Sequence, residues 1–222
     1  MCLLGWHMVK PIKKVFKVAV TGGAGSGKSS VCNRLKELGI IVVSSDALAR
    51  EAVAPGAAAH KKILNYFGKK VVLSDGKLNR QMLRRMIVND DTARRSLEQF
   101  IHPEISKLMQ RKMAQAEQNG HRVVAVEVPL LFELGMEKQF DLVVIVSADP
   151  KLRVKRLMDR DKVSREDAEE LLNVQMPDPE KVKHGGFVLS NNGSTEQLIR
   201  YVDRLYEKFL KNTEKPSKVL DS

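Results

Sequence analysis

The most constraining feature of the sequence is the stretch VAVTGGAGSGKSS (residues 18–30). An apolar, β-branched run stops at a cluster of glycines, and Lys28, Ser29 and Ser30 follow. Residues 22–29 match the phosphate-binding pattern G-x-x-x-x-G-K-[ST] in the required context, a strand before it and a helix after it. The stretch therefore predicts a strand, a loop that binds nucleotide phosphates, and a helix that begins at about Lys28.

The residue types of this loop explain how it would hold phosphate. Glycines allow backbone conformations that other residues avoid, so successive N–H groups can point at phosphate oxygens. The helix adds the positive end of its dipole, Lys28 can reach the β- and γ-phosphates, and the hydroxyl of Ser29 can bind Mg²⁺. The expected nucleotide-binding residues of the loop are Gly22, Gly25, Ser26, Gly27, Lys28, Ser29 and Ser30, with Ser29 also the metal ligand.

Further apolar runs predict an α/β fold. Runs of strand length occupy residues 15–21, 40–45, 122–129, 142–148 and 187–191. Continuous apolar runs are typical of parallel strands that are covered on both faces. We therefore expect a five-stranded parallel sheet flanked by helices, with a final helix from about Thr195 to Leu210.

Two helical segments interrupt the alternation of strands and helices along the chain. One holds RQMLRRMIV, ARRSLEQFI and HPEISKLMQRKMAQA, which we expect as successive helices, with the His-Pro pair starting the third. The other, from about residue 150, is highly charged. We expect a single domain over residues 16–210: a core of about 16–46, 120–150 and 185–210, a helical insertion at about 47–119, a lid at about 151–184, and flexible tails at 1–15 and 211–222.

Composition narrows the class of protein. No run of eighteen apolar residues occurs, so no membrane span is expected, and residues 1–8 lack the features of a signal peptide. Two cysteines make a structural disulfide improbable and fit a cytoplasmic protein. The net charge of +11 suits nucleic acid or a pocket for polyanionic small molecules. With 5% aromatic residues and no nucleic-acid-binding signature, we expect no nucleic-acid partner. The sequence does not indicate an oligomeric state.

The second strand leads to a candidate catalytic residue, Asp46, in VVSSDALAR (residues 42–50). Ligands of open α/β sheets bind at the carboxyl ends of the strands. A carboxylate there can accept the proton of an attacking hydroxyl or orient a metal-bound water. Asp46 could equally cap the following helix, as aspartate often does. Position alone leaves both alternatives open.

The charged segment holds Arg153, Arg156 and Arg160, whose spacing places them on one helix face. Arginine grips phosphate through paired hydrogen bonds, and a cation over a migrating phosphoryl group lowers the barrier. The alternative is a solvated helix face whose arginines pair with the neighbouring acidic residues, which is usual for charged helices.

The order and spacing of these motifs resemble the dephospho-CoA kinase family over about residues 16–210. The similarity is carried by TGGAGSGKSS, SSDALAR, APGAAAHKKILNYFG, SDGKLNRQMLRRMIV, LEQFIHPEI, VEVPLLFE, RLMDRD and NNGS. The family transfers phosphate from ATP to the ribose 3′-hydroxyl of dephospho-CoA, the last step of coenzyme A synthesis. The resemblance thus implies a P-loop kinase fold, Mg²⁺ as cofactor, and ATP and dephospho-CoA as partners. A nucleoside or nucleoside-monophosphate kinase, or a nucleic-acid-binding P-loop protein, remains an alternative.

The resemblance also implies residue roles. Asp46 matches the general base, and Lys28 and Arg156 match groups that act on the transferring phosphate. The remaining matches are Arg160 and Asn191 on the nucleotide side, and Arg80, His102, Leu130 and Glu133 on the acceptor side. For His102, the alternative is a structural role before a proline at a helix start.

The chain departs from the family pattern beside Asp46. Ser44 replaces the first acid of a D-x-D pair, which leaves Asp46 as the acid there. Glu127 occupies a position where many members have aspartate, and it could hold a metal-bound water from the neighbouring strand.

Overall fold

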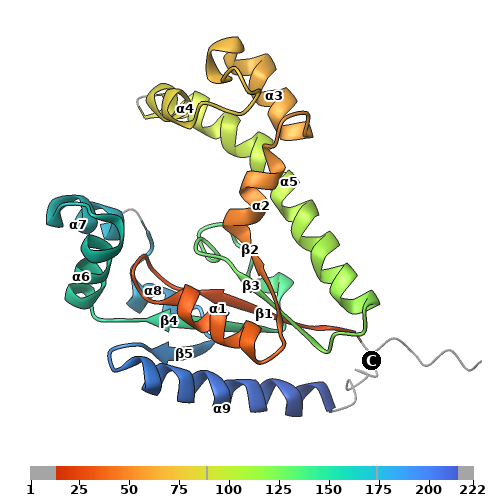
Figure 1. Ribbon diagram of the computed structural model, residues 1–222, viewed down its shortest axis with the longest axis vertical. Helices are drawn as coiled ribbons and strands as arrows, with labels where there is room; N and C mark the ends of the chain where they lie inside the picture. Colours follow the sequence, from red (N-terminus) through yellow and green to blue (C-terminus); the bar gives the residue numbers. More distant parts are fainter. Residues whose placement is uncertain (1–13, 89, 174, 215–222) are drawn as a thin grey trace, which may run out of the picture.

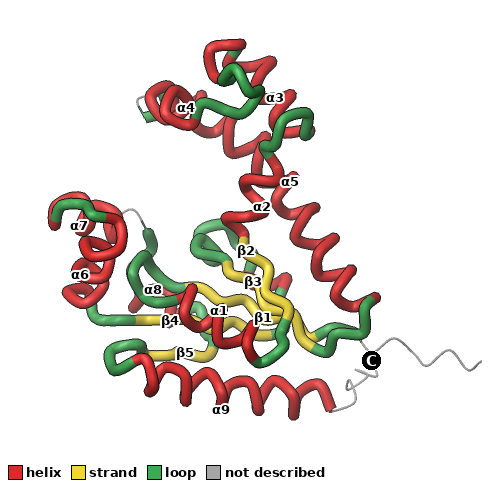
Figure 2. Tube along the Cα trace, in the orientation of Figure 1, coloured by secondary structure: helices red, strands yellow, loops and turns green. Residues whose placement is uncertain are grey.

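The computed structural model describes residues 14–88, 90–173 and 175–214 (Figures 1 and 2). Within these residues, five strands form one sheet in the order β2-β3-β1-β4-β5, and every neighbouring pair is parallel. The predicted α/β fold with a five-stranded parallel sheet is confirmed. The strands are β1 (Phe16–Thr21), β2 (Ile41–Ser44), β3 (Val123–Glu127), β4 (Leu142–Ser147) and β5 (Phe187–Ser190).

Helices cover both faces of the sheet. On one face, Val18 and Val20 of β1 pack with α1 (Lys28–Glu37) and α9 (Thr195–Glu214). On the other face, Ala19 packs with the C-terminal half of α5 (Asp91–Gln118) and with the loop after β3. Burial of alternate residues on opposite faces explains why β1 needs a continuous apolar run.

The strands run in the same direction, so their carboxyl ends share one edge of the sheet. Figure 2 shows the loops that follow β1 and β3 on the side of the sheet that faces α2 (Ser45–Ala52). The short helix η2 (Glu137–Gln139) leads from the second of these loops toward β4. This edge is where the candidate site forms.

The inserted helices project away from the sheet (Figure 1). They are α2, α3 (Ala58–Phe67), α4 (Arg80–Ile87) and the first half of α5, with the short helix η1 (Lys69–Val71). They have an apolar cluster of their own that includes Ile63, Phe67, Leu78 and Leu83.

Helix α5 corrects the prediction of separate helices on either side of His102. It runs unbroken from Asp91 to Gln118 and contains Pro103, so His102 does not mark a helix start. Proline removes one backbone hydrogen bond inside a helix. That cost is offset because both halves of α5 are packed: Phe100 joins the cluster of the inserted helices, and Met109 joins the cluster on the sheet.

The charged segment forms α6 (Pro150–Asp161), α7 (Arg165–Asn173) and α8 (Asp178–Lys183). Val154 and Leu157 of α6 pack with Ala168 of α7, and Ala24 of the glycine loop lies against them. No helix among the described residues is long and apolar enough to cross a membrane.

Most of the two predicted tails lies outside the described residues, including residues 1–8. Val15, which falls inside the first predicted tail, is fully buried against the sheet. Helix α9 continues beyond Leu210 to Glu214. Cys32 is buried and free.

Candidate active site

The loop between β1 and α1 has the backbone shape that the glycine pattern predicts. Gly22, Gly25 and Gly27 have φ angles of 143°, 72° and 97°, which other residues rarely adopt. A Cβ atom at Gly22 would lie 2.1 Å from the carbonyl oxygen of Val146, and one at Gly27 would lie 2.2 Å from the amide of Asn191. The glycines are therefore required by close contacts as well as by backbone conformation.

A cavity of about 890 Å³ opens in front of this loop. Its volume lies in the range of small-molecule sites. It is lined by parts of the glycine loop, the start of α2, the middle of α5, the loop after β3, and α6. The predicted site residues that line it are Gly25, Gly27, Lys28, Ser29, Ser30, Asp46, His102, Leu130, Arg156, Arg160 and Asn191.

Four predicted residues do not line the cavity. Gly22 and Ser26 are buried residues of the glycine loop. Arg80 is exposed at the start of α4 in the inserted helices, and Glu133 contacts α8 through residues described below. The structure therefore brings the nucleotide-side residues together with Asp46, while it leaves part of the predicted acceptor set outside the cavity.

Lys28 lines the cavity and is partly buried, and its ammonium donates a hydrogen bond of 2.9 Å to the carbonyl of Gly23. Burial lowers the pKa of Lys28 to about 8, and Glu127 opposes this shift. Lys181 and Arg153 lower the pKa further, although both are weaker influences than burial. A cation in this position is poorly compensated by the protein, and phosphate oxygens would compensate it.

Asp46 lies in the first turn of α2, with its side chain exposed to the cavity. The residue at the N-cap position is Ser44, and no side-chain hydrogen bond caps this helix. The capping alternative for Asp46 is therefore wrong. Ser44 of β2 and Glu127 of β3 are partners in the register of the sheet. The position at which the resemblance predicts an acid therefore holds a serine beside the carboxylate of Glu127.

Glu127 ends β3 and lines the cavity. Burial raises the pKa of Glu127, and the charge of Asp46 raises it further, while Lys28 opposes both. Lys28 therefore lies within electrostatic reach of two carboxylates, Glu127 at the end of β3 and Asp46 in α2.

The residues present fit Mg²⁺ only as an ion shared with a nucleotide. No group of three or more His, Cys, Asp or Glu side chains able to hold a metal occurs among the described residues. Mg²⁺ usually keeps waters and binds through one or two protein oxygens plus substrate phosphates. The exposed hydroxyl of Ser29 and the carboxylate of Glu127, both at the cavity, suit that partial donor set.

The three arginines of α6 have different environments, although they share one helix face. Arg153 is buried and donates from Nε to the carbonyl of Ala24 at 2.8 Å. Arg156 donates to the carbonyls of Asn191 at 3.0 Å and Gly25 at 3.4 Å, and it lines the cavity.

Arg160 lies at the cavity rim and pairs with the adjacent Asp161 at 2.7 Å, with its side chain 65% exposed. Its environment therefore matches the solvated alternative more closely than those of Arg153 and Arg156.

Asn191 lines the cavity and also holds the glycine loop in position. Its side-chain amide donates to the carbonyl of Ser26 at 2.8 Å, which fixes the glycine loop against the end of β5. Its backbone carbonyl accepts the hydrogen bond from Arg156.

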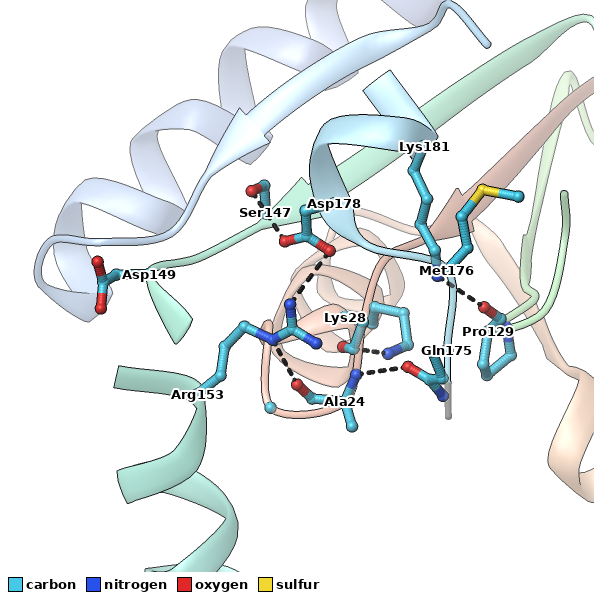
Figure 3. Close-up of polar contacts among 12 residues, drawn as sticks. Ala24, Lys28, Pro129, Ser147, Asp149, Arg153, Gln175, Met176, Asp178 and Lys181 are labelled. Carbon is cyan, nitrogen blue, oxygen red and sulfur yellow. Dashed lines mark hydrogen bonds and ion pairs between the residues drawn. The ribbon is translucent and has the colours of Figure 1, made fainter. Parts of the chain in front are cut away.

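Sequence reasoning missed three residues in or near α8: Gln175, Asp178 and Lys181. Gln175 accepts a hydrogen bond of 2.8 Å from the N–H of Ala24, and Asp178 pairs with Arg153 at 3.2 Å (Figure 3). Lys181 is fully buried. These residues are three positions apart, a spacing that would place them on one face of a helix. The spacing does not predict that the side chain of Lys181 is buried.

Comparison with known proteins identifies the family of the chain. A sequence model of dephospho-CoA kinase matches residues 16–197. The chain is 40% identical over 191 residues to a dephospho-CoA kinase of Geobacter sulfurreducens, covering 86% of this chain and 97% of that protein.

Solved structures show the same fold. A dephospho-CoA kinase from Campylobacter jejuni superposes with a TM-score of 0.69 at 27% identity, covering 88% of this chain and 98% of that one. A shikimate kinase from Acinetobacter baumannii, at 18% identity and a TM-score of 0.52, covers 92% and 98% and shares the fold alone. With the P-loop kinase fold, and with a family match over most of its length, the chain belongs to the dephospho-CoA kinase family.

Proposed function

We propose that this chain carries out the reaction of its family, ATP-dependent phosphorylation of dephospho-CoA in coenzyme A synthesis, at the cavity described above. The products would be ADP and coenzyme A, which carries the new phosphate on the ribose 3′-hydroxyl. The reaction would take place in the cytoplasm. The observation that carries the proposal is that one cavity joins the glycine loop, the Asp46 carboxylate and Leu130 of the loop after β3.

The glycine loop would hold the phosphates of ATP. Its backbone N–H groups and the start of α1 offer positive charge to the phosphate oxygens. Lys28 would leave the carbonyl of Gly23 and bind the β- and γ-phosphates, where its positive charge is better compensated than in its present position.

Asp46 would accept the proton of the attacking hydroxyl. It lies in the first turn of α2, directly after β2, and lines the same cavity as the glycine loop that would hold the γ-phosphate, and no side-chain hydrogen bond caps this helix. Proton removal by a positioned carboxylate makes the hydroxyl a better nucleophile as the bond to phosphorus forms.

Arg156 would stabilise the charge on the migrating phosphoryl group. Its guanidinium is already held at the cavity by the carbonyls of Gly25 and Asn191. A cation fixed before the reaction needs little reorganisation when charge develops, which is why such groups lower the barrier. Closure of α6 and α7 over the site would exclude water and prevent hydrolysis of ATP.

Mg²⁺ bound with ATP would neutralise negative charge on the β- and γ-phosphates. Ser29 would contribute its hydroxyl to the ion, and Glu127 would hold one of its waters. With Ser44 in place of an acid, Asp46 and Glu127 would supply the negative charge near such an ion.

The acceptor would enter between the inserted helices and the loop after β3. His102 of α5 and Leu130, which is 40% exposed, line this part of the cavity. Arg80 would contribute only if the inserted helices and the sheet approach one another around the acceptor.

The test is ATP consumption by the purified chain with Mg²⁺, with and without dephospho-CoA. We expect ADP formation that depends on dephospho-CoA, a product heavier by one phosphoryl group, and a ³¹P signal of a 3′-phosphomonoester. Adenosine, AMP and single-stranded nucleic acid serve as comparison acceptors or effectors. Preference for a nucleoside or nucleotide, or ATP hydrolysis stimulated by nucleic acid, would overturn the proposal.

A further inference from the structure

Lys181 of α8 has an unusual environment for a lysine. Among the described residues it is the largest fully buried side chain. Its ammonium lies 3.3 Å from the carboxylate of Glu133 and 3.5 Å from the carbonyl of Pro129 (Figure 3 shows the second contact). Burying a charge is unfavourable unless it is paired, so a lysine held in this way marks a contact that the fold depends on.

Both partners of Lys181 belong to residues 128–133, which we name the acceptor loop. Pro129 and Leu130 of this loop line the cavity, whereas Glu133 and Lys181 do not. The acceptor loop therefore has one side on the cavity and another side on α8. Because Lys181 does not line the cavity but contacts the loop that does, it is a candidate positioning residue rather than a residue that touches the acceptor.

Other contacts join the same two segments. The backbone N–H of Met176 donates to the carboxylate of Glu133 at 3.0 Å. The rings of Phe132 and His184 stack, with centroids 4.8 Å apart and planes at 20°. We name residues 175–184 the bridge segment, because the acceptor loop is attached to it at the start, in the middle and at the end.

The bridge segment is also attached to the glycine loop. Gln175 accepts from the N–H of Ala24, and Asp178 pairs with Arg153, whose Nε donates to the carbonyl of Ala24. Asp178 further accepts a hydrogen bond of 2.9 Å from the hydroxyl of Ser147, which anchors it to the end of β4. Figure 3 shows Arg153 and Gln175 reaching Ala24 from opposite sides, with Asp178 between Arg153 and Ser147.

We propose that the bridge segment sets the position of the acceptor loop relative to the glycine loop, with Lys181 as its principal positioning residue. The inference rests on the proposed function, in which these two loops hold acceptor and donor. In-line phosphoryl transfer depends on the distance and alignment of the two substrates, and small displacements reduce the rate steeply. A single segment bonded to both loops can fix that alignment.

The test compares Lys181→Met with Lys183→Met, an exposed lysine on the same helix. A third variant, Lys181→Met with Glu133→Leu, replaces both partners of the ion pair, the fully buried Lys181 and the partly exposed Glu133, so that neither charge is left without its partner. Each is assayed for thermal stability and for KM and kcat with both substrates. Hydrogen–deuterium exchange of the acceptor-loop peptide is measured without substrates, so it does not depend on the identity of the acceptor.

We expect Lys181→Met and the double variant to raise KM for dephospho-CoA by about tenfold, with a smaller change in KM for ATP. Exchange in the acceptor loop should become faster, and Lys183→Met should resemble the wild type. If Lys181→Met does not fold, the double variant decides. A folded double variant with unchanged KM and unchanged exchange would show that Lys181 serves stability alone and overturn the inference. Wild-type turnover with dephospho-CoA tests the proposed function separately.

Discussion

The ammonium of Lys28 lies 2.9 Å from the carbonyl oxygen of Gly23, inside the loop that is shaped to receive phosphate. A neutral carbonyl compensates a buried cation only partly, and burial accordingly lowers the pKa of Lys28 to about 8. Lys28, which we propose binds ATP, is therefore also a source of instability in the protein without ligand.

Replacing Lys28 by methionine should raise stability and remove activity. A pKa lowered from 10.5 to about 8 corresponds to roughly 3 kcal/mol of unfavourable free energy when Lys28 is charged. The gain in the free energy of unfolding should be at most about 3 kcal/mol near pH 7, because the hydrogen bond to Gly23 is lost. Turnover should fall by about a hundredfold or more.

The pH dependence of this gain follows from the direction of the shift. Between pH 8 and 10.5 the unfolded chain binds more protons at Lys28 than the folded chain, so stability of the wild type rises with pH there. The advantage of Lys28→Met should thus be full below about pH 8 and absent above about pH 10.5. Urea unfolding of both proteins at several pH values measures it, and an advantage that does not change with pH would contradict the assignment.

ATP binding should take up protons on the alkaline side of neutrality. The phosphates of ATP would raise the pKa of Lys28 from about 8 toward its ordinary value, so binding near pH 9 would add up to about one proton. Calorimetric titration in buffers of different ionisation enthalpy counts these protons. Lys28→Met is the control and should show no such uptake; equal uptake by both proteins would locate the proton elsewhere.

Replacing Asp46 by asparagine should slow phosphoryl transfer while leaving ATP binding nearly unchanged. The amide keeps the size of the side chain but cannot accept the hydroxyl proton, so we expect kcat to fall by about 10²- to 10⁴-fold. Glu51→Gln removes an exposed carboxylate from the same helix and should behave as the wild type. A folded Asp46→Asn enzyme with full turnover would exclude Asp46 as the base.

The fold was predictable because its strands are apolar runs with turn residues between them, a local property of the sequence. The continuity of α5 was not, since Pro103 normally indicates a helix start or break. Only the packing of Phe100 and Met109 in different clusters compensates the missing backbone hydrogen bond, and such packing depends on distant segments.

The candidate site was predictable to the extent that its residues follow strands or occupy a motif. Lys28 and Asp46 meet these conditions, and the cavity contains both. Lys181 meets neither, because it lies in EKVKH, which reads as an exposed, charged helix. Its burial arises from contact with Glu133 and Pro129, far away in the sequence, and no periodicity signals it.

Replacing Arg156 by lysine should reduce kcat by about 10²-fold while retaining the positive charge. Lysine cannot bind the carbonyls of Gly25 and Asn191 and a phosphoryl group together, since it lacks the planar fork of the guanidinium. Arg165→Lys, at an exposed position of α7, is the matched control. An Arg156→Lys enzyme with wild-type kcat would show that charge suffices and geometry does not matter.

Replacing Glu127 by glutamine should shift the alkaline limit of activity to lower pH. The negative charge of Glu127 opposes the lowering of the pKa of Lys28, so its removal should move that pKa below about 8. The pH profile of kcat/KM for ATP reports groups of the free enzyme, and its alkaline limb should therefore shift downward in Glu127→Gln. Glu37→Gln, at the far end of α1, should leave the limb in place. An unmoved limb in Glu127→Gln would mean that Lys28 does not control it or that Glu127 exerts no field on Lys28.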